Sequence, residues 1–325
     1  MFSRPRYPRL RIGSKNELAK TISDSALPYP QALTLINDVI RNFDYYWRDN
    51  SENSQPNRGK FVRSAARTPL GVLLERIDKK VLAPHDRLVP NYIFGGMTGR
   101  SHIQAARSLL GQERGRILAS LDITHFFEQI REQRVFFFFY RKCGCSPRAS
   151  RLLASLCCVP VGQKGSMSTE KTLARGFATS TRLAVWCNLD TFIHLDREVK
   201  KLLKKYDPRV AIFIDDIGIS ASRVSQEKIS AVVKIVEKIL SDFDNNQRLP
   251  VNPAKTKIRT YASGAEHLGL KLGRNKLAMG SKSRSRRDSV INLLKKRGAY
   301  SPTRARRLLL KKQAYQRYQG QIRSA

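Results

Sequence analysis

The sequence predicts a mixed α+β fold, and three stretches carry this prediction. Along Arg116–Asp122 the side chains alternate between two faces, which is the period of a β-strand. Two short β-rich runs, Val210–Ile214 and Ile217–Ser220, are separated by two residues, which is the spacing of a tight hairpin. Ser225–Phe243 has apolar side chains at steps of three and four residues with lysines opposite, the pattern of an amphipathic helix that packs on a sheet.

Further helices are expected before the hairpin. Glu132–Cys143 has the pattern of a helix closed by Gly144, and Pro147–Cys158 that of a second helix opened by proline in its first turn. The glycine-rich segment Gly95–Ser101 lacks the standard spacing of a phosphate-cradling loop. We therefore expect helices to follow strands in this part of the chain.

The composition indicates a folded core and a polyanionic partner. The chain has 325 residues, 41% of them hydrophobic, which argues against an intrinsically disordered chain. Its 61 Lys and Arg residues against 26 Asp and Glu residues give a net charge of +35. Nucleic acid is the commonest polyanion that neutralises such a charge, because each phosphate contact releases condensed counterions.

A cytoplasmic protein without a membrane partner is the expectation for localisation. No apolar run approaches the roughly 18 residues of a spanning helix, and the basic N-terminus lacks the apolar segment of a secretory signal. The five cysteines and five histidines form no metal-ligand spacing, so we interpret the cysteines as reduced thiols.

The C-terminal fifth of the chain has a composition of its own. From Arg274 onward there are 16 Lys and Arg residues against one acid, Asp288. A helix start is predicted at Ser301–Thr303, and leucines and tyrosines are interleaved with the cations further on. These features predict a basic helical unit that packs on the body, whereas the alternative is a solvated tail.

Three acids stand out against the positive charge. Asp122 ends the predicted strand, and Asp215 and Asp216 separate the two arms of the hairpin, where turn preference alone would favour Asn-Gly or Asp-Gly. Clustered carboxylates are natural ligands of Mg²⁺. Two such ions, about 3.5–4 Å apart, would catalyse phosphoryl transfer. An acidic pair alone is weak evidence, because acids at turn tips are usually just solvated.

Read together, these segments resemble the reverse transcriptase family. The motifs that carry the resemblance occur in the family's order: Leu121–Ile130, Arg175–Thr181, Phe213–Ile217, Asn252–Thr256 and His267–Leu270. They are similar to the first palm motif, the Gln-Gly-x-x-Thr-Ser-Pro segment, the aromatic-x-Asp-Asp motif, the lysine motif near the triphosphate and the primer grip. Within the family, the compact length looks most like bacterial retron-type and defence-associated enzymes.

The resemblance implies a right-hand polymerase fold with fingers, a palm built on an antiparallel sheet, and a basic helical thumb. It divides the chain into an N-terminal basic extension and helix at 1–55, fingers at 56–115, a palm with finger insertions at 116–272, and the thumb at 273–325.

The resemblance also implies roles for individual residues. Asp122, Asp215 and Asp216 are the expected catalytic acids that hold two Mg²⁺ ions, with the Ile123 carbonyl as a further ligand. Phe127 would lie beneath the sugar and exclude a 2′-hydroxyl; the alternative is that Phe127 is a core residue. The other expected nucleotide-binding residues are Lys60, Arg63, Arg175, Gly176 and Lys255; Leu268, Gly269 and Leu270 form the primer grip; and Arg304, Arg306, Arg307, Lys311 and Lys312 bind nucleic acid.

Three positions depart from the family pattern. Arg175 stands where the family has Gln, Thr181 where it has Pro, and Phe213 where it has Tyr. These departures leave the metal-binding acids intact. They bear on template and nucleotide discrimination, because the residue before Gly176 is expected near the nascent base pair.

The expected function is RNA-directed DNA synthesis on a cognate structured non-coding RNA, in a retron-like or antiphage defence system. The expected partners are that RNA as template and also as primer, dNTPs, and the DNA product or RNA–DNA hybrid; an effector protein or a second copy of the chain is a further candidate. Two alternatives stay open: an RNA-dependent RNA polymerase, which should lack a bulky sugar gate, and a non-catalytic RNA-binding scaffold, which should have lost one of the acids.

Overall fold

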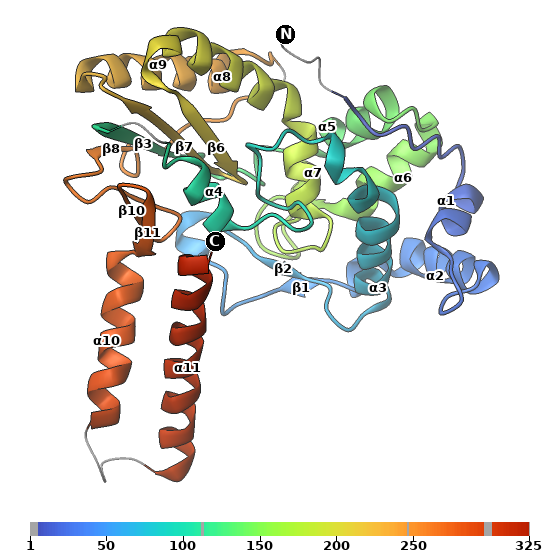
Figure 1. Ribbon diagram of the computed structural model, residues 1–325. Helices are drawn as coiled ribbons and strands as arrows, with labels where there is room; N and C mark the ends of the chain where they lie inside the picture. Colours follow the sequence, from blue (N-terminus) through green and yellow to red (C-terminus); the bar gives the residue numbers. More distant parts are fainter. Residues whose placement is uncertain (1–5, 112–113, 246, 296–300, 325) are drawn as a thin grey trace.

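The computed structural model describes residues 6–111, 114–245, 247–295 and 301–324 of the chain. Figure 1 shows a broad body of helices around a β-sheet, from which two long helices project side by side. Helices and strands occur in one body, as the mixed α+β prediction requires.

The central sheet has four antiparallel strands in the order β6-β7-β3-β8. They are β3 (Arg116–Asp122), β6 (Arg209–Phe213), β7 (Asp216–Ser222) and β8 (Lys257–Thr260). The predicted strand and the predicted hairpin are both confirmed, and they pair with each other through β3 and β7.

Strand β3 contributes to two hydrophobic clusters, because its side chains alternate between the two faces of the sheet. Ile117, Ala119 and Leu121 join the main hydrophobic cluster, whereas Leu118 joins a second cluster on the other face together with Ala105. Two helices lie along one face of the sheet and a short helix lies against the other (Figure 1). These helices are α8 (Leu189–Leu202) and α9 (Gln226–Asp242) on the first face, and α4 (His102–Ser108) on the second.

The remainder of the body is mostly helical. Its helices are α1 (Lys15–Ile22), α2 (Tyr29–Asn42), α3 (Pro69–Arg76), α5 (Glu132–Phe137), α6 (Pro147–Cys157) and α7 (Ser180–Cys187). Two small antiparallel ribbons accompany them: β1 (Arg48–Asp49) with β2 (Arg63–Ser64), and β4 (Cys158–Pro160) with β5 (Lys171–Leu173).

The two helices predicted before the hairpin are confirmed. Helix α5 continues as a π-helical turn over Phe138–Lys142 and stops before Gly144, whose φ is +73°. Helix α6 begins at a proline in its first turn, and the Ser146 hydroxyl caps it by accepting from the Ala149 N–H.

The tip of the β6–β7 hairpin lies one residue earlier than predicted. Ile214 and Asp215 form the two-residue turn, and Asp216 is already the first residue of β7, opposite Phe213. The positive φ that such a turn needs is taken by Ile214, at +60°. A β-branched residue rarely adopts this conformation, so contacts outside the turn must hold it there.

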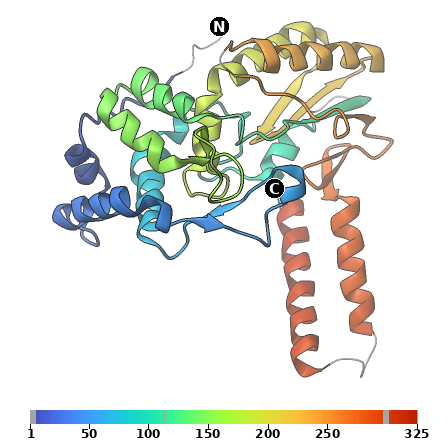
Figure 2. The same cartoon turned by 180° about the vertical axis from the view of Figure 1, so that it is seen from behind.

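The C-terminal region confirms the predicted helical unit. Strands β9 (Glu266–His267), β10 (Leu270–Gly273) and β11 (Lys276–Met279) form a small antiparallel sheet. Helices α10 (Ser281–Lys295) and α11 (Pro302–Ser324) then run out from the body and back (Figures 1 and 2). The end of α11 is anchored, because Ile322 is only 3% exposed in the second core cluster.

Among the described residues, no helix combines the length and the apolar composition needed to cross a membrane.

Candidate active site

The three predicted carboxylates come together at one end of the central sheet. Asp122 at the end of β3 lies directly opposite Asp216 at the start of β7. The neighbouring turn residue, Asp215, accepts a hydrogen bond at its carbonyl from the Ile123 N–H at 2.9 Å. Strand register and this hydrogen bond therefore fix the backbone of all three acids relative to one another.

Negative charge is concentrated at this end of the sheet. Burial raises the pKa of Asp215, and the charge of Asp122 adds to the effect. Burial, followed by the negative charges of Asp215 and Asp122, raises the pKa of Asp216 to about 7, while Lys255 opposes the shift. The carboxylates therefore repel one another, and a cation between them would relieve that repulsion.

Lys255 is the cation that reaches these acids. Its Nζ lies 2.6 Å from Asp122 Oδ1, and its side chain is half exposed, so water screens the pair. The backbone supports this placement, because the Asn252 N–H donates to the Asp122 carbonyl at 2.8 Å and the Lys255 N–H donates to the Asn252 carbonyl at 3.1 Å. Lys255 was predicted near the triphosphate, and the structure puts it at the edge of the carboxylates.

The donor set fits a hard divalent cation, since it offers three carboxylates close together, and burial together with the charges of Asp215 and Asp122 raises the pKa of Asp216. Within the described residues, His, Cys, Asp and Glu side chains do not form a preassembled group of three ligands. Asp122 is held by Lys255 instead, and it would exchange this partner for a metal ion. Ile123, the further predicted ligand, forms a β-bridge with Val251 beside the acids.

A second set of residues surrounds Phe127. Its ring is 7% exposed, and the Arg175 guanidinium lies over it with 5.0 Å between the Cζ atom and the ring centroid. Arg175 is in turn held by Glu128, to which its Nε and Nη2 donate at 3.1 and 3.0 Å. Both the bidentate pair and the aromatic contact restrict where the Arg175 side chain and the Phe127 ring can lie.

Gly176 is required by a close approach of two chain segments. Its φ is +103°, and a Cβ atom at this position would lie 2.4 Å from the Arg63 carbonyl oxygen. The Arg63 N–H donates to the Arg175 carbonyl at 2.6 Å across the same contact. The β2 segment is thereby pinned to the loop that carries Arg175, and both border a small cavity of about 30 Å³ with Glu128.

The predicted cations of the fingers have different surroundings. Arg63 is 5% exposed and pairs with Asp49 and the carbonyl oxygens of Pro160 and Gly162, and burial lowers its pKa to about 10. Its guanidinium therefore joins β2 to β1 and to the segment at 160–162. Lys60 is partly exposed. Contact of these cations with a triphosphate stays a prediction.

The predicted primer-grip residues form a tight turn between β9 and β10. Leu268 and Gly269 both have positive φ, +52° and +74°, as a type I′ turn requires, and Leu270 is fully buried. The preceding His267 bonds through its ring to the Ser120 hydroxyl of β3 at 3.2 Å. Burial lowers the pKa of His267 to about 4, so its ring is neutral and joins the small sheet to the central one.

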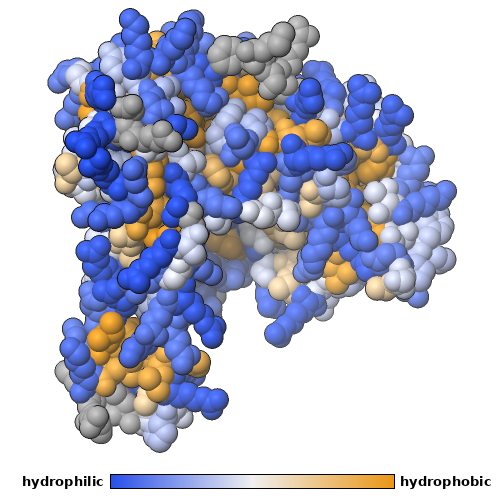
Figure 3. Space-filling model, in the orientation of Figure 1, coloured by the Kyte–Doolittle hydropathy of each residue, from blue (hydrophilic) through white to orange (hydrophobic). Residues whose placement is uncertain are grey.

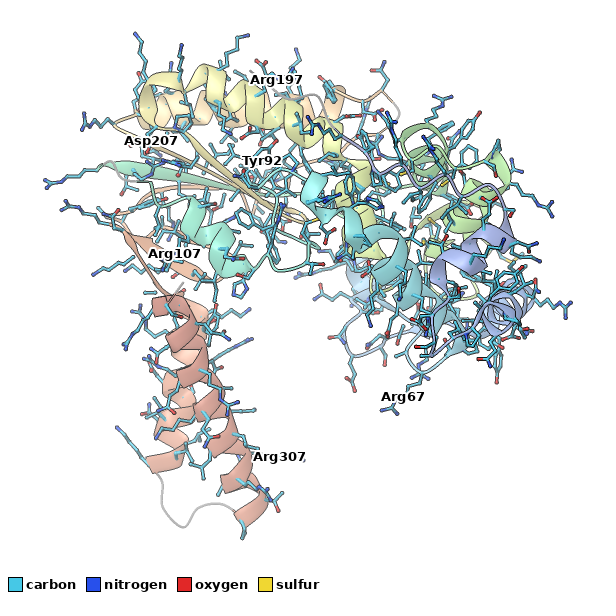
Figure 4. All side chains as sticks on the ribbon, turned by 45° about the vertical axis from the view of Figure 1, so that its right-hand side comes forward. Arg67, Tyr92, Arg107, Arg197, Asp207 and Arg307 are labelled. Atoms are coloured by element: carbon cyan, nitrogen blue, oxygen red, sulfur yellow. The ribbon has the colours of Figure 1, made fainter. Side chains whose placement is uncertain are left out.

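The predicted nucleic-acid-binding cations lie on α11, away from its anchored end. All five are exposed, and Figure 4 shows Arg307 on the outer half of the helix. Figure 3 shows polar side chains along the projecting helices, an apolar patch on their outer half, and an open notch between them and the body.

A chain of aromatic contacts joins α11 to the β6–β7 hairpin. The Tyr318 ring stacks on His102 with centroids 5.8 Å apart and bonds to its Nε2 at 3.0 Å. His102 in turn meets the edge of Phe213 at 6.4 Å.

Sequence analysis did not identify two supports of this site. Gly95 lies against the hairpin tip, where a Cβ would come within 2.4 Å of the Ile214 nitrogen, and the Phe94 N–H donates to the Ile212 carbonyl at 2.8 Å. The adjacent glycines of the 95–101 segment were the available signal. Glu128 is the second support, and nothing in the local pattern separates it from a solvated acid.

Most of the sequence that builds this site matches one known protein family. Residues 65–272 match a protein-family model described as reverse transcriptase (RNA-dependent DNA polymerase). The match covers more than half of the chain and includes the three carboxylates, Phe127 and Lys255. It leaves out Lys60, Arg63 and the projecting helices. None of the curated proteins matches the sequence.

Proposed function

The chain belongs to the reverse transcriptase family and is an RNA-directed DNA polymerase, a nucleotidyltransferase; from this premise we propose that Asp122, Asp215 and Asp216 are its catalytic acids. The observation that carries the proposal is the pairing of Asp122 with Asp216 across β3 and β7, beside Asp215, where burial and then the charges of Asp215 and Asp122 raise the pKa of Asp216 to about 7.

Reverse transcriptase domains generally use divalent metal ions such as Mg²⁺. When bound, two such ions would activate the primer 3′-hydroxyl and stabilise the charge on the leaving pyrophosphate. We assign Asp122 and the two hairpin acids to hold them, with the Ile123 carbonyl as a further ligand. The role of Lys255 follows from its contact with Asp122: released from that carboxylate, its ammonium group is available to the triphosphate.

Sugar selection is assigned to Phe127. Its restrained ring is suited to block a 2′-hydroxyl by steric exclusion, since the Arg175–Glu128 pair limits its movement. Arg175 would add a cation near the phosphates of the nascent pair, with Gly176 allowing the close approach of the chain. Lys60 and Arg63 complete the nucleotide-binding set, Lys60 by direct contact and Arg63 by bracing the fingers.

The projecting helices are assigned to grip nucleic acid as a thumb. Their exposed cations contact phosphates, while recognition of a particular RNA would come from its folded shape and 2′-hydroxyls. The proposed partner is a structured non-coding RNA that supplies the template, in a retron-like or antiphage defence system of the cytoplasm, with an effector protein or a second copy of the chain as an additional partner. This assignment rests on the resemblance alone.

Phe127 argues against an RNA-dependent RNA polymerase, which should lack a bulky residue beneath the sugar. The presence of all three acids argues against a non-catalytic scaffold.

The test is to purify the protein with its accompanying nucleic acid and to supply labelled dNTPs or NTPs with Mg²⁺. The wild type should make a DNase-sensitive product from dNTPs, and a variant carrying Asp215→Asn and Asp216→Asn should make none while binding RNA as before. Sequencing the RNA that accompanies the protein identifies the template. A product made from NTPs, or no product despite bound RNA, would contradict the proposal.

A further inference from the structure

One short helix contacts both the projecting helices and the β6–β7 hairpin. Helix α4 lies between the end of α11 and the strands of the hairpin (Figure 1). Arg107, near the end of α4, donates through Nη2 to the Ile322 carbonyl of α11 at 3.4 Å. His102, the first residue of α4, lies against Tyr318 of α11 and Phe213 of β6. Helix α4 therefore connects α11 directly to the hairpin.

The contact with α11 fixes the orientation of the His102 ring. The Tyr318 ring stacks on it with 5.8 Å between the centroids and 24° between the planes, and the Tyr318 hydroxyl lies 3.0 Å from His102 Nε2. Burial lowers the pKa of His102, so its ring is uncharged at neutral pH. A stack combined with a hydrogen bond defines both the position and the rotation of the ring, which apolar burial alone does not.

The backbone at the start of α4 is restrained as well. The Ser101 hydroxyl accepts from the Gln104 N–H at 3.2 Å, and the Gln104 side chain accepts from the Ser101 N–H at 2.8 Å, which completes a capping box. Before the helix, the Phe94 N–H donates to the Ile212 carbonyl of β6 at 2.8 Å. The His102 ring therefore projects from a backbone that is itself held against the hairpin.

On its other side, the His102 ring meets the residue next to the acids. Phe213 lies edge-on to it, with 6.4 Å between the centroids and 79° between the planes. Phe213 is the last residue of β6, pairs with Asp216 and directly precedes the turn at Ile214 and Asp215. Because Ile214 has a positive φ that a β-branched residue rarely adopts, the turn depends on contacts from outside. The ring contact between His102 and Phe213 is one of these contacts.

We propose that His102 is a positioning residue for DNA synthesis, which holds Phe213 in place only while Tyr318 is stacked on it. Through Phe213 it positions the two acids of the hairpin, so this inference rests on the proposed function. The exposed cations that we assign to nucleic acid lie on the same helix as Tyr318, towards its other end. The seating of α11 on α4 thereby links the grip on nucleic acid to the placement of the acids.

Hydrogen exchange of the hairpin amides tests this link without requiring catalysis. In the nucleic-acid-free protein, Tyr318→Leu keeps an apolar side chain but removes the stack and the hydroxyl. It should raise exchange across residues 212–217 by about three- to tenfold, which is what one aromatic pair contributes. Tyr318→Phe keeps the stack and should give a smaller increase. The matched control is Tyr315→Leu, three residues earlier on α11, which should leave hairpin exchange unchanged: Tyr315 packs on the second core cluster but takes part in none of these ring contacts among the described residues.

The single-turnover rate of nucleotide addition tests the consequence for synthesis. Saturating primer–template and dNTP remove any effect on binding. Tyr318→Leu and His102→Leu should each lower the rate by about three- to tenfold. The double variant should lose no more than the larger single loss, because both changes break the same connection. Tyr315→Leu should keep the rate of the wild type.

Three results would overturn the proposal: hairpin exchange in Tyr318→Leu equal to that of the wild type, an equal rise in Tyr315→Leu, or rate losses that add in the double variant. Faster exchange with an unchanged rate would also remove the positioning role. Failure of the proposed function looks different, since the wild type then makes no DNA, while hydrogen exchange still shows whether Tyr318 holds the hairpin.

Discussion

Two clusters of aspartates lie in the body, and they differ in what neutralises them. In the first, Arg182 is buried and donates to both Asp78 and Asp86, with the two bonds to Asp86 at 2.9 and 3.1 Å. Burial alone would lower the pKa of Arg182, but the hydrogen bonds to Asp86 and Asp78 outweigh it and raise the value. This cluster is complete within the protein.

The second cluster, formed by Asp122, Asp215 and Asp216, has one half-exposed lysine for three carboxylates. Its excess negative charge is left for a ligand to neutralise. The comparison indicates that the closed charge network is structural, and the open one is the cluster to which we assign the chemistry.

The glycine-rich segment touches both clusters. Gly95 packs on the hairpin tip at Ile214, whereas a Cβ on Gly96 would lie 2.9 Å from the Thr181 carbonyl carbon, next to Arg182. The glycine-rich segment, which lacks a phosphate-binding pattern, thus joins the Arg182 cluster to the open carboxylate cluster.

Breaking the closed cluster should have the largest effect on stability. Arg182→Met leaves two aspartates without their cation and should lower the free energy of unfolding by about 3–5 kcal/mol. Lys255→Met, at the open cluster, should change it by less than about 1 kcal/mol, because an exposed pair contributes little. Urea unfolding of both variants checks the contrast, and equal losses would remove the distinction between the clusters.

A substitution in the glycine-rich segment should reduce DNA synthesis more than it reduces stability. In Gly95→Ala the new Cβ displaces the Ile214 backbone, and DNA synthesis should fall about a hundredfold, as expected for a misplacement of about 1 Å. Gly273→Ala, where the nearest atom is at 3.5 Å, is the control and should retain activity. Full activity in Gly95→Ala would show that the hairpin does not depend on this contact.

Changes next to the open cluster should alter sugar selectivity, and Phe127→Ala should also lower stability because Phe127 is buried. Phe127→Ala should raise ribonucleotide relative to deoxyribonucleotide incorporation by about tenfold or more, a factor that corresponds to about 1.4 kcal/mol. Arg175→Gln removes the guanidinium that lies over the Phe127 ring but leaves the ring in place. It should give a smaller shift in the same direction. Single-nucleotide extension kinetics measure the ratio, and an unchanged ratio in Phe127→Ala would remove the steric assignment.

The smallest effect per substituted residue is expected for substitutions on the projecting helices, which should alter RNA binding. Replacing Arg306, Arg307, Lys311 and Lys312 by Gln should weaken RNA binding and make its dependence on salt less steep, by about 0.7–0.9 in the logarithmic slope for each lost phosphate contact. The melting temperature should not change, since these side chains are exposed. A slope identical to that of the wild type would place RNA elsewhere on the molecule.

Periodic elements could be predicted from the sequence because their signal is local. The alternation in Arg116–Asp122 and the helical repeat beginning at Ser225 each depend on one side facing the core, and both elements appear where expected. The helical C-terminal unit also follows from its interleaved leucines and tyrosines.

Features set by tertiary contacts could not be predicted. The hairpin tip shifted by one residue because Gly95 packs against Ile214 and the positive φ falls on that β-branched residue, contrary to local preference. Arg63 belongs to a basic run that resembles a triphosphate site, yet its partners include the carbonyls of Pro160 and Gly162, about a hundred positions away. The division of the chain into fingers, palm and thumb at residues 55, 115 and 272 stays a prediction.

The central claim is that the open carboxylate cluster takes up divalent cations, and calorimetric titration of Mg²⁺ into the nucleic-acid-free protein tests it most directly. The wild type should bind Mg²⁺ saturably, and Asp216→Asn should lose that binding. Asp242→Asn, at an exposed position on α9, should bind like the wild type. Equal Mg²⁺ binding by the wild type and Asp216→Asn would contradict the assignment of these acids.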